Sequence, residues 1–276
     1  MNITAKEVRS LREMSGAGMM ECKNALTKAG GNVENAFKLL REKGVAKAEK
    51  RSGRNANEGL IGIKETDKGT AIIEVNSETD FVSRNKEFRT LVNDILDITI
   101  QEKGNFEKTS EIASEKINEA VGKIGENIVF RRSEFIEGNI FNYTHNSIER
   151  GLGKIGVLLK LSSDKICDLS EIGKNICMHI AATSPLSILK EDLDISIIES
   201  EKEIILQQLK DSGKPDNILQ KVIEGKLNKY LEEIVLMNQK YVIDPNLNVE
   251  EVIQDFNKSN NINIKIERFI RFQLGK

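Results

Sequence analysis

Histidine and cysteine are the side chains of this sequence best suited to nucleophilic or metal chemistry, and they are few. The histidines are His145 and His179, and the cysteines are Cys22, Cys167 and Cys177. Since the cysteines lack a C-x-x-C spacing, we expect reduced, buried thiols and neither a disulfide nor a zinc site. His179 lies in an apolar helical pattern with no second ligand or nucleophile spaced to join it, which predicts a buried histidine with satisfied hydrogen bonds.

The glycine run Gly151–Gly156 matches G-x-G-x-x-G, the fingerprint of dinucleotide-binding folds. That motif needs a following helix whose N-terminus meets the pyrophosphate, whereas Val157–Leu161 predicts a strand. A hairpin turn is therefore favoured, and a nucleotide-binding enzyme is the alternative. The sequence has no G-x-S-x-G, Walker A or H-E-x-x-H signature, so we expect a non-enzyme without a cofactor or a metal.

A third candidate is the turn formed by Thr79, Asp80, Phe81 and Val82. The β-branched run before it predicts a buried strand, and a helical pattern follows it. The turn places a large apolar ring beside a carboxylate. Aromatic rings are more often buried, so one interpretation folds the ring beneath the next helix. The other leaves the ring exposed as a wedge for a partner.

Composition sets limits on the partners and on the size of the core. The 276 residues are 39% hydrophobic, enough for two or three compact units. Lysine and arginine number 41 against 43 aspartate and glutamate, so we expect no direct nucleic-acid binding. No apolar stretch of membrane-spanning length and no secretory leader is visible, so we expect no membrane association and a cytoplasmic protein.

Helix signals organise residues 1–44 into a three-helix module similar to ubiquitin-associated (UBA) domains, which are usually docking surfaces. A capping box at Thr4 and Glu7 predicts the first helix, and glycines separate the second and third. Gly44 ends the last helical pattern. Residues 45–57 are basic and turn-rich, which predicts a linker.

The remaining chain predicts two duplicated α+β subdomains with small antiparallel sheets, residues 58–136 and 137–276. Each half contains a predicted hairpin, a helix and a late strand. Inserted in the second half, at about 195–236, we expect an antiparallel coiled-coil hairpin with its turn at Ser212–Pro215. Its helical stripes comprise Ile195, Ile198, Glu201, Ile205 and Leu209, then Ile218, Val222, Leu227, Leu231 and Ile234.

Five segments resemble bacterial elongation factor Ts proteins, in the family's order along the chain. They are GAGMMECKNAL, EVNSETDFVSRNKEF, KIGENIVFRR, EGKLNKY and IERFIRFQLG. The resemblance implies a guanine-nucleotide exchange factor that binds elongation factor Tu in its GDP-bound and nucleotide-free states. It also implies that the turn inserts Phe81 between two helices of the GTPase while Asp80 helps to fix the turn, which displaces bound Mg²⁺ and releases GDP.

The resemblance implies further partner contacts at Arg12, Met19 and Met20. Adjacent helical residues point about 100° apart, so the two methionines cannot both lie in the same small core, and one should be exposed. His145 corresponds to a family residue near the partner, in a turn that is longer here. Some family members continue into an extra C-terminal helix, whose contact we expect to be missing from a chain that ends at Lys276.

Two alternatives concern partners. The coiled coil or the core could serve self-association, giving a homodimer. The alternative hypothesis for the function of the whole chain is a UBA-type scaffold or protein-interaction module without exchange activity. This hypothesis predicts that removing the Phe81 ring leaves function intact.

Overall fold

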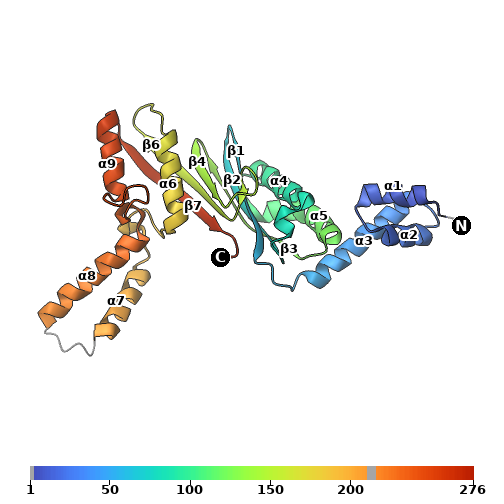
Figure 1. The fold of residues 1–276 in the computed structure, drawn as a ribbon, viewed down its shortest axis with the longest axis horizontal. Coiled ribbons are helices and arrows are strands. Elements are labelled where there is room, and N and C mark those ends of the chain that lie inside the picture. Colours follow the sequence, from blue (N-terminus) through green and yellow to red (C-terminus); the bar gives the residue numbers. More distant parts are fainter. Residues whose placement is uncertain (1–2, 210–215) are drawn as a thin grey trace. The chain divides into compact units, whose positions relative to one another are not determined.

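The computed structural model describes residues 3–209 and 216–276, which form two compact units (Figure 1). The first unit comprises the described residues up to Gly138, with residues 146–155 and 272–276; the second comprises residues 139–145 and the described residues from 156 to 271. Helices and separate small sheets make up the fold, so the predicted α+β class is confirmed. Within the described ranges, no helix has the length and apolar content needed to cross a membrane.

Three helices open the first unit: α1 (Ala5–Ser15), α2 (Met19–Lys28) and α3 (Val33–Arg51). The predicted capping box starts α1, because Thr4 Oγ1 accepts from Glu7 N–H and the Glu7 carboxylate accepts from Thr4 N–H. The helices share a small apolar core formed by Val8, Leu11, Cys22, Ala25, Leu26 and Ala36.

The prediction of a linker at residues 45–57 is wrong as far as Arg51, because α3 continues to that residue. Alanine and long charged side chains in this stretch are good helix formers, and Ala48 packs against the core of the first unit. Gly44 lies inside the helix and does not end it. It allows close approach of α5 (Phe106–Ile124), since a Cβ added to Gly122 of α5 would lie 3.5 Å from the Gly44 Cα.

A four-stranded sheet forms the centre of the first unit, in the order β3-β2-β1-β5. β2 pairs antiparallel with β1 and β3, and every residue of β2 is buried. α4 and α5 cover one face (Figure 1), and Phe88, Ile95 and Leu96 of α4 are fully buried there. The bounds are β1 Glu58–Thr66, β2 Gly69–Ser77, β3 Ile128–Glu137, β5 Leu152–Gly153 and α4 Lys86–Gln101.

The chain returns to this sheet twice, so the predicted boundary between subdomains 58–136 and 137–276 needs correction. Residues 146–155 belong to the first unit because β5 pairs with β1, with Gly153 opposite Ile61. Residues 272–276 also belong to it, and Gly275 N–H donates to Glu74 Oε1 of β2 at 2.8 Å. Both returns depend on hydrogen bonds between residues far apart in sequence, which local patterns do not reveal.

The second unit is built on a three-stranded sheet in the order β4-β6-β7. α6 packs against β4, where a Cβ on Gly173 would lie 2.4 Å from Phe141 Cγ. α9 begins at a capping box formed by Asn248 and Glu251 and leads into β7. The bounds are β4 Ile140–His145, β6 Ile155–Ser163, α6 Ser170–Thr183, α9 Val249–Asn260 and β7 Ile264–Gln273.

Helices α7 (Ile195–Leu209) and α8 (Asp216–Ile234) lie side by side in the second unit (Figure 1). Most of the predicted stripe lies in their shared cluster, including Ile198, Ile205, Leu209, Leu227, Leu231 and Ile234. Ile195 and Ile218 do not belong to it, because they are 70% and 46% exposed near the starts of the two helices. The predicted turn at Ser212–Pro215 lies outside the described residues.

Candidate functional site

The central strand β2 and helix α4 position the turn at Thr79–Val82. β2 ends at Ser77, a short 3₁₀ segment spans Val82–Arg84, and α4 begins after Asn85. The Asn85 side chain caps α4 by accepting from Glu87 N–H at 2.8 Å. The turn therefore emerges from a strand paired on both sides and enters a capped helix, which leaves it few ways to move.

Adjacent side chains of the turn point in opposite directions. Phe81 is 80% exposed, whereas Val82 is 5% exposed and belongs to the main core of the first unit. The ring is therefore not folded beneath α4. A large apolar side chain held in water lacks the stabilisation that burial supplies, and at 80% exposure this ring is accessible to a partner.

Backbone hydrogen bonds hold the turn in shape. Ser83 donates to the Asp80 carbonyl oxygen from its N–H at 3.2 Å and from Oγ at 2.6 Å, and Arg84 N–H donates to the Phe81 carbonyl at 3.2 Å. Asp80 thus fixes the turn through its carbonyl. Its exposed carboxylate makes no hydrogen bond or ion pair to any residue in the described ranges, so this negative charge lies free beside the ring.

Thr79 links the turn to the loop between α5 and β3. Its N–H donates to Glu126 Oε2 at 2.9 Å, and its hydroxyl donates to Glu126 Oε1 at 2.6 Å. Glu126 was not among the predicted site residues. Glu126 follows Gly125, which ends α5, and only the folded chain brings it to Thr79.

Arg12, Met19 and Met20 lie around the connection between α1 and α2. Arg12 is exposed, and the methionines are 54% and 66% exposed. Both methionines are accessible, one more than the helical geometry requires, because α2 contacts the core of the three-helix module through Cys22, Ala25 and Leu26. All three residues are exposed on the three-helix module, and their role in partner binding stays a prediction.

His145 belongs to the second unit, whereas the other predicted site residues belong to the first. It is exposed at the end of β4, in the second unit, and its Nδ1 lies 3.1 Å from the Tyr143 hydroxyl. Its role in partner binding stays a prediction.

His179 is a buried residue with satisfied hydrogen bonds, as predicted. Val242 N–H donates to its Nδ1 at 3.3 Å, so Nε2 carries the proton and donates to Gln239 Oε1 at 2.9 Å. Burial, partly offset by the Gln239 bond, lowers the pKa of the imidazole and keeps it neutral.

The cysteines and the glycine run complete the sequence candidates. All three cysteines are free thiols, but only Cys22 and Cys177 are buried; Cys167 is partly exposed, so the prediction of burial is wrong there. The glycine run contains β5 and leads into β6, with no helix to receive a pyrophosphate. Across residues 3–209 and 216–276, no cluster of three His, Cys, Asp or Glu side chains could hold a metal.

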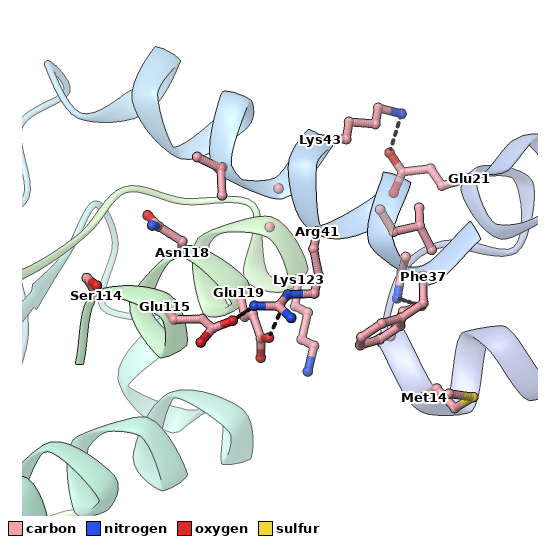
Figure 2. A pocket seen from close by; sticks show the side chains of 16 residues that line it. Met14, Glu21, Phe37, Arg41, Lys43, Ser114, Glu115, Asn118, Glu119 and Lys123 are labelled. Carbon is pink, nitrogen blue, oxygen red and sulfur yellow. Dashed lines mark hydrogen bonds and ion pairs between the residues drawn. The ribbon is translucent and has the colours of Figure 1, made fainter. Parts of the chain in front are cut away.

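A cavity of about 310 Å³ lies between the three-helix module and α5 (Figure 2). Its apolar lining includes Met14, Phe37 and Leu40. Most of its charged lining is paired, because Arg41 contacts both Glu115 and Glu119 of α5, and Lys43 contacts Glu21. None of its lining residues belongs to the Phe81 turn. We interpret it as a packing gap where α3 crosses α5.

Comparisons with known proteins agree on one family. The family model described as "Elongation factor TS" matches residues 78–276. "Elongation factor Ts" of Bartonella bacilliformis is 43% identical over 288 residues, covering 100% of this chain and 94% of the relative. "Elongation factor Ts" of Parvibaculum lavamentivorans is 44% identical, covering 99% of this chain and 93% of the relative. Since the match extends over the exposed turn and nearly the whole length of both proteins, the chain belongs to the elongation factor Ts family.

Proposed function

We propose that this protein accelerates guanine-nucleotide exchange on elongation factor Tu by inserting the Phe81 turn into the GTPase. Family membership implies exchange on elongation factor Tu. The observation that supports this mechanism is the 80% exposure of Phe81 on a turn whose neighbour Val82 is buried. Such a factor makes and breaks no covalent bond, and it works in the cytoplasm, where translation takes place.

The mechanism follows from how a GTPase holds its nucleotide. Backbone amides cradle the phosphates of GDP, and Mg²⁺ bridges protein and phosphate oxygens. A ring that enters between two GTPase helices shifts these groups and displaces the ion. The carboxylate of Asp80, next to Phe81 on the turn, would enter the GTPase together with the ring. Because the wedge binds the nucleotide-depleted state more tightly, nucleotide and factor weaken each other's binding reciprocally, and GDP leaves faster.

The rigidity of the turn adds to its effect. A segment that already has its bound shape loses little conformational entropy on binding, so more of the contact energy remains to displace Mg²⁺. The exposed Arg12, Met19 and Met20 on the UBA-like module would supply a second contact that orients the wedge. We assign α7 and α8 the role of a coiled-coil arm.

The test is release of fluorescent GDP from purified elongation factor Tu after addition of this protein. Wild type should accelerate release, and Phe81→Ala should lose roughly tenfold or more of that acceleration. Ile112→Ala is the matched control, because Ile112 is an apolar side chain of α5 that is 52% exposed; it should behave as wild type. Full acceleration by Phe81→Ala would refute the wedge. No acceleration by wild type would favour the scaffold alternative.

A further inference from the structure

Two carboxylates join the Phe81 turn to the loop that follows α5. Glu126 accepts two hydrogen bonds from Thr79, at 2.9 Å from the N–H and 2.6 Å from the hydroxyl. In return, Glu78 Oε1 accepts from Asn127 N–H at 2.7 Å. Each segment thus donates a backbone N–H to a carboxylate of the other. Bonds of this kind are charge-assisted and stronger than neutral ones, so the pair forms a reciprocal clamp.

A third segment is tied to the same clamp. Arg54, just beyond α3, approaches Glu78 from Nη1 at 3.3 Å, and its carbonyl accepts from Asn127 Nδ2 at 2.8 Å. Asn127 is 4% exposed, so the centre of this junction is buried. The helix that ends the three-helix module and the turn that carries Phe81 therefore share one support.

We propose that Glu126 is a positioning residue for exchange, which holds the Phe81 ring in its inserting orientation through Thr79. This inference rests on the proposed function. Without the clamp, the turn would keep the short-range bonds around Asp80 and Phe81 but lose its attachment to the α5–β3 loop. The ring would then sample other orientations, and each encounter with the GTPase would have to order it again.

The experiment measures GDP release against factor concentration. Glu126→Ala should lower the maximal rate about tenfold, which corresponds to about 1.4 kcal/mol, while the half-saturating concentration changes less than about twofold. The maximal rate should change because the Phe81 wedge acts on the bound nucleotide. The half-saturating concentration should change little because, in the proposed mechanism, the three-helix module supplies the docking contact. In the same variant, the Thr79 amide should lose protection from hydrogen exchange, because its acceptor is gone.

A double variant separates positioning from general stability. If Glu126 acts through the ring, Glu126→Ala should cause no further loss of rate in a Phe81→Ala background. The matched control is Glu251→Ala, which removes a carboxylate that accepts Asn248 N–H at 2.8 Å at the start of α9. It should lower the melting temperature without lowering the maximal rate.

The outcomes distinguish this inference from the proposed function. Full acceleration by Phe81→Ala would overturn the wedge itself. Two outcomes would refute the positioning role of Glu126 and leave the wedge intact. In the first, Phe81→Ala loses acceleration while Glu126→Ala keeps the wild-type maximal rate. In the second, the losses of the two single variants multiply in the double variant. If Glu126→Ala does not fold, Glu126→Met decides. Methionine keeps the length of the side chain and removes both acceptor oxygens for Thr79, so a maximal rate equal to wild type would refute the role.

Discussion

Replacing Arg132 by methionine tests how the buried carboxylate of Glu74 is stabilised. Glu74 is fully buried on β2, opposite Arg132 of β3. Arg132 Nε lies 2.7 Å from Glu74 Oε2. Asn76 Nδ2 and Gly275 N–H donate to Oε1 at 3.0 and 2.8 Å. The Arg132 guanidinium also lies 4.2 Å from the centre of the Phe272 ring. Methionine keeps most of the apolar stem and removes the charge, the donors to Glu74 and to the Gln273 carbonyl, and the guanidinium that lies over this ring.

The size of the effect follows from what Glu74 retains. Removing one partner of a fully buried ion pair costs about 3–5 kcal/mol. Here Arg132 is 34% exposed, Glu74 keeps its two other hydrogen bonds, and Arg131 lies 4.0 Å away at a β-bulge. These groups offset part of the loss, so Arg132→Met should lower the free energy of unfolding by about 2–3 kcal/mol.

Urea denaturation followed by circular dichroism measures this loss. The double variant Glu74→Gln/Arg132→Met should be at least about 1 kcal/mol more stable than Arg132→Met, because glutamine accepts the remaining hydrogen bonds without a buried charge. The control is Lys103→Met, since Lys103 and Glu137 form an exposed pair, and its loss should stay below about 0.5 kcal/mol. A loss below about 1 kcal/mol in Arg132→Met, or a double variant less stable than the single one, would refute the reasoning.

Two further predictions follow from titratable groups of the second unit. The pKa of His179 is lowered in the folded state from its ordinary value of 6.5, so below that pH the unfolded chain binds a proton that the folded chain does not. Stability should therefore fall by up to about 1.4 kcal/mol per pH unit below pH 6.5, and His179→Gln should show a smaller fall in denaturation curves measured across this range. Burial raises the pKa of the Cys177 thiol, so a thiol reagent should modify the partly exposed Cys167 first. The fast phase of the reaction with the thiol reagent should therefore disappear in Cys167→Ser. If it persists in this variant, Cys167 is not the thiol that reacts first.

Local patterns were enough to predict many elements of the fold. The capping signal at Thr4 predicted the start of α1, and the hairpin predicted in residues 58–136 is the pair β1 and β2. These signals are readable because caps, turns and hydrophobic periods depend on residues only a few positions apart. The family likewise follows from the amino-acid sequence, because the turn and four other segments resemble it in the same order along the chain.

Local patterns failed where distant residues decide. α5 and α9 were not assigned from the sequence, and α3 extends past Gly44 because its far end packs against α5 and the core. The clamp of Glu126 and Glu78 joins positions nearly fifty residues apart, with a separation of 47 for the Thr79–Glu126 bonds. No propensity or period encodes such a pairing.

The Phe81 turn shows both contributions. The sequence by itself determined that an apolar ring and a carboxylate follow a buried strand, and that they match a family of exchange factors. Only the tertiary structure decided that Phe81 faces solvent while Val82 enters the core. Burial depends on what the rest of the chain places around a side chain, and here the core residues of β1, β2 and α4 pack around Val82 and not around Phe81.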